Sequence, residues 1–354
     1  MIPSVLLSLL LFGTAFVIVP GIQLSFEPPK VVFSEVVIAL LFIFFFFQND
    51  FFKKIRSTKH AYFYLGIITL LGIHALLGRG DLLGNVFRFQ GAISIVFLVI
   101  TAVLSSLFIF KIEKWVIYLA LVLELLLTLV VGPNPAHRWI GSFGEPNALA
   151  AFIIFLNALL LFRKEQIKWI FVVIASLLVI LSGSRSGMIA FGMQLLLYSL
   201  SQYTRIQKQY LLVVGACIIV FSLILPFLDS RNVNENRAEI WKAAVSSGLK
   251  HPIIGSGFGN VTSPLQTFSK EKATNVQYEF VDSSHSIILD WWVQGGIIGV
   301  LLLIGLISST VILLYKEKNF QMLILFFGLL EMLLFNPASI VTLIAFWWVI
   351  GTAM

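Results

Sequence analysis

The stretch from His285 to Tyr315, HSIILDWWVQGGIIGVLLLIGLISSTVILLY, is almost entirely apolar and contains one formally charged residue, Asp290. A helix needs about 20 apolar residues to cross the hydrocarbon layer of a membrane. The stretch therefore predicts a membrane-spanning helix, and the small polar residues around His285 predict that this helix starts at a membrane surface.

Apolar runs of similar length recur along the whole chain. Of its 354 residues, 59% are hydrophobic and 12% are charged, and the mean hydropathy is +0.98, whereas about 25% of residues are charged in soluble domains. The first run lacks the basic start and the cleavage site of a signal peptide, so we interpret it as a span. We predict one all-α, polytopic membrane domain over residues 1–354, with spans near 4–20, 31–47, 61–78, 91–110, 115–131, 147–162, 169–182, 188–202, 210–228, 285–315, 320–335 and 338–354.

Basic residues gather in alternate short connections between these runs, and such connections face the cytoplasm by the positive-inside rule. The net charge of +7 therefore reflects membrane topology and predicts no nucleic acid partner. These cytoplasmic residues are Lys53, Lys54, Arg56 and Lys59; Lys111 and Lys114; Arg163, Lys164 and Lys168; Arg205 and Lys208; and Lys316 and Lys318.

The remaining connections are predicted to face outward, and both termini to face the cytoplasm. One of them, the large loop 229–284, is far longer than an ordinary connection, and loops of that length are usually functional. The single cysteine, Cys217, lies in an apolar run, which excludes a disulfide framework or a thiolate metal site within one chain. The other outward connections are 21–30, 79–90, 132–146, 183–187 and a turn at Asn336 and Pro337.

The first candidate site is the hairpin Ser182-Gly183-Ser184-Arg185-Ser186-Gly187. It is so short that Arg185 is predicted at the outer membrane surface, where an arginine is costly if it faces lipid. Arg185 is either a turn residue that reaches to the surface or part of an anion site. Small neighbours, which let an anionic oxygen approach backbone N–H groups, favour the anion site.

The second candidate is the segment that starts at Asn236-Arg237 and runs to Gly248 in the outer loop. At about 100° per residue, Arg237, Trp241, Val245 and Gly248 fall on one stripe of an amphipathic helix. Arg237 is therefore predicted to point toward membrane or protein rather than toward water. The following Gly255-x-Gly257-x-Gly259 neither follows a strand nor opens a helix, so we interpret it as a tight turn rather than a dinucleotide motif.

The third candidate is Ser283-Ser284-His285-Ser286. A lone histidine is more often structural than catalytic, but this one lies at a predicted helix start near the membrane surface. There the helix N-terminus favours the neutral imidazole that a general base needs. Asp290 lies about 140° around the helix and is not expected to orient His285, so the orienting group must come from another span.

Further polar residues lie in the outer loop 132–146 and inside the predicted spans. Glu124 is either a hydrogen-bonded acid between helices or a functional residue, and the acids Glu35, Asp290 and Glu331 also lie within spans. The sequence contains no Asp-x-Asp motif, His-Glu-x-x-His motif or nucleophile elbow, so we expect no metal and no cofactor. The predicted substrate-binding residues are Arg138, Glu145, Asn147, Trp241 and Ser286.

Arginines and one histidine at an outward-facing site suit the displacement of a pyrophosphate from a sugar. That reaction needs cations for the leaving group and a base for the attacking hydroxyl, and little acid help. Arginine suits phosphate because its planar fork of donors matches the phosphate oxygens.

Four motifs occur in one order along the chain: Pro146-Asn147 at the start of a span, Ser184-Arg185 in a hairpin, Arg237 with Gly248 after ten residues, and His285-Ser286 followed by Gly296 and Gly299. In these motifs the chain resembles the O-antigen ligase and O-antigen polymerase family. The resemblance runs from the loop at Phe143 to about Gly299. It implies a GT-C-like helical bundle with an outward cavity, and a metal-independent, anomer-inverting membrane glycosyltransferase.

The resemblance also implies roles for residues. Arg185 and Arg237 would bind the pyrophosphate of an undecaprenyl-pyrophosphate-linked glycan, and His285 would deprotonate or orient the hydroxyl of a glycan or lipid-linked acceptor. The site would lie on the outer side of the plasma (inner) membrane. A chain-length regulator and a flippase are candidate partners.

Two alternatives stay open at this point. One arginine-glycine spacing is present, whereas typical polymerases have one in each of two outer loops, so the chain is either a ligase or a polymerase. A transporter of lipid-linked oligosaccharide could also have a dozen spans. It should, however, spread cations along a path between both leaflets, whereas Arg185, Arg237 and His285 are all predicted at one face.

Overall fold

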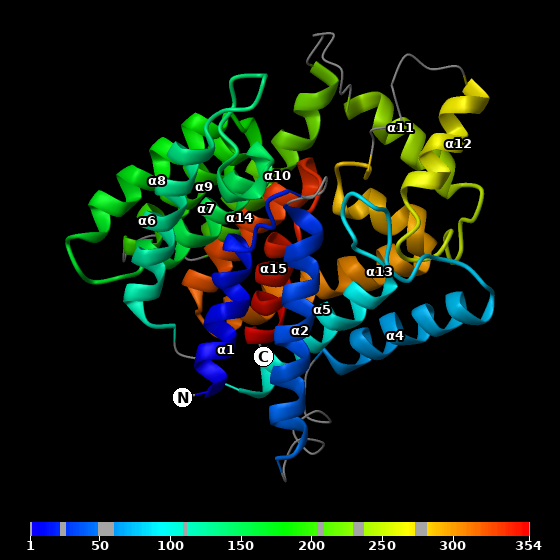
Figure 1. Ribbon diagram of the computed structural model, residues 1–354, viewed down its shortest axis with the longest axis horizontal. Helices are drawn as coiled ribbons and strands as arrows, with labels where there is room; N and C mark the ends of the chain where they lie inside the picture. Colours follow the sequence, from blue (N-terminus) through cyan, green and yellow to red (C-terminus); the bar gives the residue numbers. More distant parts are fainter. Residues whose placement is uncertain are drawn as a thin grey trace.

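The computed structural model describes residues 2–21, 26–48, 60–108, 112–203, 209–228, 237–272 and 282–353. Within these ranges the chain forms fourteen α-helices and two 3-10 turns (Figure 1), which confirms the all-α prediction. The elements are α1 (Ile2–Leu11), η1 (Gly13–Phe16), α2 (Glu27–Phe46), α4 (Ala61–Leu76), α5 (Ala92–Leu107), α6 (Lys114–Val131), η2 (Gly141–Phe143), α7 (Pro146–Leu161), α8 (Lys168–Ser182), α9 (Arg185–Gln202), α10 (Gln209–Leu228), α11 (Arg237–Gly248), α12 (Thr262–Lys272), α13 (Ile287–Lys316), α14 (Phe320–Phe335) and α15 (Ile340–Thr352).

Each of the twelve predicted apolar runs overlaps one of these helices, with shifted ends. The first run was predicted to continue to residue 20, but α1 ends at Leu11 and a 3-10 turn follows it. The outer loop 229–284 carries α11 and α12, and its segments 229–236 and 273–281 lie outside the described residues.

Three described helices, α2, α6 and α13, are long and apolar enough to cross a membrane. Eight shorter apolar helices of 10–17 residues accompany them. A chain with this many apolar helices is a multi-pass membrane protein, while the number of twelve spans stays a prediction.

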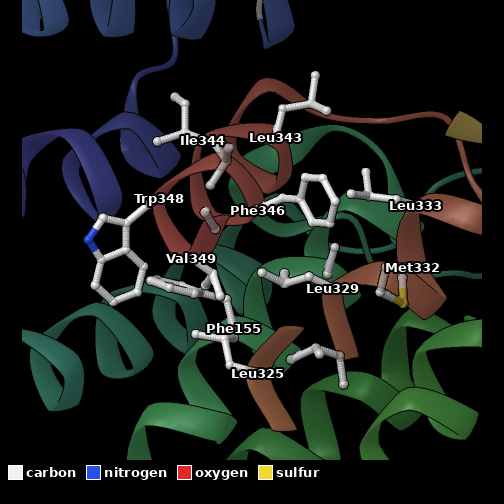
Figure 2. Packing of buried hydrophobic residues seen from close by; sticks show 14 of the residues in the cluster. Phe155, Leu325, Leu329, Met332, Leu333, Leu343, Ile344, Phe346, Trp348 and Val349 are labelled. Atoms are coloured by element: carbon white, nitrogen blue, oxygen red, sulfur yellow. The ribbon is translucent and has the colours of Figure 1, made fainter. Parts of the chain in front are cut away.

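The centre of the bundle consists of α7, α14 and α15, which are buried on every side. All residues from Ala148 to Leu161, from Leu323 to Phe335 and from Ile340 to Gly351 are buried. Figure 2 shows how side chains of the three helices interlock, with Phe155 from α7 next to those of α14 and α15. A helix that is apolar all round belongs inside a bundle, so these helices form the core on which the others pack.

The connections between helices lie at two ends of the helical bundle. The segments before α6 and α8 meet where Lys114 Nζ lies 2.8 Å from Glu165 Oε1 and Arg163 Nη2 donates to the Ile112 carbonyl at 3.2 Å. Figure 1 shows α11 and α12 at the upper end of the view, and both chain termini toward the lower end. The predicted topology places both termini on the cytoplasmic side. Which end faces outward stays a prediction.

Helix α13 is not the single uninterrupted span that the sequence predicts. Gly296 has φ 59° and ψ −157°, which breaks the helix. The segment after α11 pairs with the break: Ile297 N donates to the Pro252 carbonyl at 2.8 Å, and Ser256 N donates to the Val293 carbonyl at 2.9 Å. The backbone groups released by the break are therefore satisfied by the glycine-containing turn of the outer loop.

We predict that Gly296→Ala lowers the unfolding temperature of the protein in detergent. A left-handed conformation costs a residue with a Cβ about 1–2 kcal/mol, and the new Cβ would also overlap the backbone of Ile253. Gly72→Ala is the matched control, because a Cβ at Gly72 in α4 meets nothing within 4 Å. Equal unfolding temperatures of the two variants would contradict the role of Gly296.

Candidate functional site

The connection between α14 and α15 (residues 336–339) joins three helix ends. Asn336 Nδ2 donates to Ser186 Oγ of α9 at 2.7 Å and to the Met332 carbonyl at 2.9 Å. Asn336 Oδ1 accepts from Arg237 Nη2 of α11 at 3.4 Å. This one carboxamide therefore brings the starts of α9 and α11, which carry Arg185 and Arg237, to the same place.

The serine-arginine hairpin forms as predicted, but its second helix starts at Arg185 rather than at residue 188. Gly183 is left-handed and ends α8, and Ser184 Oγ accepts from Gly187 N at 3.2 Å as the N-cap of α9. Arg185 is exposed in the first turn of α9. A cation is disfavoured at a helix N-terminus, so Arg185 is not there to stabilise the helix.

Helix α11 turns Arg237 toward protein, as predicted. Its buried face is formed by Ile240, Trp241, Ala243, Ala244, Ser247 and Gly248. The prediction that Val245 shares this face is wrong, because Val245 is 44% exposed. Trp241 packs against Phe335 of α14 with ring centroids 6.1 Å apart. This contact packs α11 onto the core of the bundle.

The spacing between Arg237 and Gly248 has a packing reason. A Cβ at Gly248 would overlap the indole of Trp292 in α13. Trp292 Nε1 donates to the Val245 carbonyl at 3.1 Å. Gly248 thus lets α11 approach α13 closely, three turns away from Arg237.

The histidine turn (residues 283–286) precedes α13 instead of forming its first turn. The N-cap of α13 is Ser286, and His285 has a left-handed backbone with φ 59°. His285 N donates to Ser283 Oγ at 3.0 Å, and Ser284 N donates to Asp290 Oδ1 at 2.7 Å. The predicted position at the helix start is therefore two residues off, and Asp290 acts on the backbone of the turn.

His285 and Ser286 are both buried, with 5% and 4% exposure. Non-glycine residues rarely adopt a left-handed backbone, and they do so where the surroundings enforce it, often at functional sites. The short hydrogen bonds inside the histidine turn are such surroundings.

Arg138 and Asn147 bind each other. Arg138 Nη2 donates to Asn147 Oδ1 at 3.0 Å, and Arg138 Nε donates to the Ser182 carbonyl at 2.9 Å. Arg138 therefore connects the loop 132–145, the start of α7 and the hairpin that carries Arg185. The substrate-binding roles of Arg138 and Asn147 stay predictions.

Glu124 has the structural role that the sequence left as one of two alternatives. Its carboxylate accepts from Ser142 N at 2.9 Å and from Ser142 Oγ at 2.7 Å. The Ser142 carbonyl in turn accepts from Lys30 Nζ at 2.8 Å, and all three side chains are fully buried. These bonds hold the Gly141–Phe143 turn inside the bundle.

Arg88 is a site residue that sequence reasoning missed. Its Nε lies 2.6 Å from Asp282 Oδ2, and its Nη2 lies 3.0 Å from Glu145 Oε2. Burial alone would lower the pKa of Arg88, but the two carboxylates outweigh that effect and hold its pKa above the usual value. Burial raises the pKa of Glu145, and Arg88 opposes that rise. The only sequence signal was that Arg88 and both acids lie in connections predicted to face outward.

Gln90 links this charged group to the α14–α15 connection. Gln90 Nε2 donates to the Ala338 carbonyl and to Glu27 Oε1, both at 2.9 Å. The connections 79–91, 132–145 and 336–339, the hairpin 183–184 and the histidine turn are thus tied together at one end of the bundle. Among the described residues, no group of three or more His, Cys, Asp or Glu is placed to hold a metal ion.

Residues 170–304 match the family described as O-antigen ligase. This range includes Arg185, Arg237 and His285, and it confirms over these residues the resemblance inferred from the motifs. No curated protein matches the chain.

We predict that Asn336→Ala destabilises the protein, because Ser186 Oγ and the Met332 carbonyl lose a donor and Arg237 loses an acceptor. Each buried polar group left unsatisfied costs about 1–3 kcal/mol. The measurement is the unfolding temperature in detergent, with Gln202→Ala as control, because Gln202 is an exposed carboxamide. An unchanged unfolding temperature for Asn336→Ala would show that the junction is not needed.

Proposed function

We propose that the protein is a membrane glycosyltransferase of cell-surface polysaccharide biosynthesis, because residues 170–304 match the O-antigen ligase family. It transfers a glycan from undecaprenyl pyrophosphate to a sugar hydroxyl of a glycan or lipid-linked acceptor at the outer face of the plasma membrane. The observation that carries the proposal is the junction at Asn336, which brings together the helix starts that bear Arg185 and Arg237.

Arg185 and Arg237 bind the pyrophosphate of the donor in this proposal. Arg185 is exposed, and Arg237 is partly exposed with Nη2 at a long 3.4 Å from a neutral carboxamide. In this proposal both guanidinium groups reach the pyrophosphate from the helix starts that Asn336 joins. Two guanidinium forks stabilise the negative charge that develops when the bond between the anomeric carbon and the pyrophosphate oxygen breaks.

His285 deprotonates or orients the acceptor hydroxyl. The hydroxyl oxygen attacks the anomeric carbon from the face opposite the pyrophosphate, its proton passes to the imidazole, and the pyrophosphate leaves with the bonding electron pair. Attack from the opposite face inverts the anomeric configuration. The left-handed backbone at His285 supports this role, because it fixes the segment from which the imidazole extends.

Glu145, Arg138, Asn147, Trp241 and Ser286 complete the proposed substrate site. The side chain of Glu145 is 26% exposed, more than the 16% of Asp282, and carboxylates accept hydrogen bonds from sugar hydroxyls. The GT-C-like fold, the outward face, the absence of a metal requirement and partners such as a flippase or a chain-length regulator belong to the same proposal.

The test is glycan transfer by the purified full chain in detergent with EDTA, using an undecaprenyl-pyrophosphate glycan. We expect activity from wild type and a loss of about 10²–10⁴-fold for His285→Ala. For Arg237→Ala we expect a loss of about 10²–10³-fold, with only partial rescue by Arg237→Lys, because lysine lacks the fork. Lys242→Ala is the matched control, because Lys242 is an exposed cation on the same helix.

Product size separates a polymerase, which gives a ladder, from a ligase, which gives one conjugate. Full activity of His285→Ala would contradict the assigned site. If wild type transfers nothing to any acceptor but moves the lipid-linked glycan across proteoliposome membranes, the protein is a transporter.

A further inference from the structure

The charged clamp formed by Arg88, Glu145 and Asp282 joins two parts of the chain that are far apart in sequence. Arg88 and Glu145 lie before the matched range 170–304, and Asp282 lies within it, three residues before His285. Arg88 contacts both carboxylates at 2.6 and 3.0 Å, and its side chain is 13% exposed. Nothing in the proposed chemistry of pyrophosphate binding uses this cation.

The loop that carries Arg88 contacts Asp282 through a second residue, Asn85. Asn85 Oδ1 accepts from Phe87 N at 3.0 Å and from Arg88 N at 2.9 Å, which closes a local turn. Asn85 Nδ2 donates to the Asp282 carbonyl at 3.1 Å. Asp282 is therefore held from the same loop at its side chain and at its backbone.

Direct binding of phosphate by Arg88 does not fit its surroundings. Its Nε and Nη2 groups already face carboxylates, and the two acids together exceed its charge. A phosphate would have to displace a buried ion pair, and removing one partner of such a pair is strongly unfavourable. Arg185 is exposed, whereas the Arg88 side chain is 13% exposed and lies between two carboxylates, so the two arginines have different surroundings.

We propose that Arg88 is a positioning residue that fixes the histidine turn by holding Asp282, and that it sets the distance of His285 from the acceptor bound near Glu145. This inference rests on the proposed function. The residues that follow Asp282 continue this connection to His285. His285 N donates to Ser283 Oγ at 3.0 Å, and Ser284 N donates to Asp290 Oδ1 at 2.7 Å. A left-handed residue keeps its conformation only when neighbours enforce it, so loosening Asp282 releases His285.

The first readout is hydrogen exchange of the full chain in detergent, which needs no activity. In Arg88→Gln we expect peptides covering residues 283–290 to exchange about 10-fold faster or more, because the turn opens locally. Arg79→Gln is the matched control: Arg79 lies in the same loop, but its Nη1 donates to the Gly255 carbonyl at 3.4 Å and not to the histidine turn. Unchanged exchange in Arg88→Gln, with the unfolding temperature retained, overturns the proposal.

The second readout is kinetic. We expect Arg88→Gln to lower kcat about 10²-fold, as for a catalytic group misplaced by about 1 Å, while KM for the donor stays within about 3-fold because Arg185 and Arg237 remain. Arg88→Lys, which keeps the charge, restores part of kcat. In an Asp282→Asn background, Arg88→Gln should cause little further loss, because both substitutions break one link.

The outcomes separate the two proposals. A raised KM for the donor with unchanged exchange shows that Arg88 contacts substrate and overturns the positioning role. Full, multiplicative losses for Arg88→Gln and Asp282→Asn overturn it as well. If wild type transfers no glycan, the proposed function fails and the kinetic consequence with it, whereas the exchange data still decide whether Arg88 fixes the turn. Should Arg88→Gln not fold, Asp282→Asn is measured by the same exchange experiment, and unchanged exchange there overturns the proposal.

Discussion

The end of the molecule that carries the proposed site depends on one buried carboxamide, Asn336, at the end of α14. Its side chain is 3% exposed and makes hydrogen bonds to α9, to α11 and to its own helix. A buried polar group without partners is costly, so the surrounding helix ends are held where they satisfy it. Residues 323–335 of α14 are buried, so the core fixes the position of Asn336. The hydrogen bonds of Asn336 in turn position the start of α9, which carries Arg185, and the start of α11.

This arrangement divides the charged groups of the site into two kinds. Arg185 and Arg237 lie at the two helix starts that Asn336 joins, and Arg237 Nη2 lies 3.4 Å from the Asn336 carboxamide, whereas Arg88 lies between Glu145 and Asp282. A buried cation between two carboxylates is costly to separate from them. Gln90, which lies two residues after Arg88, donates to the Ala338 carbonyl in the α14–α15 connection, the connection that also contains Asn336. In the proposed function, Arg185 and Arg237 bind the leaving group, while Arg88 fixes the turn that carries His285.

Much of this arrangement could be predicted from the sequence, because long apolar runs, alternating basic loops and turn-forming residues act locally. The position of Pro146 at a helix start, the hairpin at Arg185 and the turn toward protein of Arg237 follow from such local rules. The partner of Arg88 could not be predicted, since Arg88 and Asp282 are separated by 194 positions and only the packing of the bundle brings them together. The break at Gly296 was missed for the same reason: its glycine fits a regular span, and the groups that pair with the break come from another loop. Val245 was wrongly assigned to the buried face, because helical periodicity alone does not show which parts of a helix its neighbours cover.

The most direct test of the account is a cryo-electron microscopy structure of the full chain with bound undecaprenyl pyrophosphate. The account predicts that the two phosphates lie between the Arg185 and Arg237 guanidinium groups, next to Asn336 and on the same side as His285, with the Arg88 ion pairs intact. Phosphate density at Arg88, or at the opposite end of the bundle near Lys114, would contradict it.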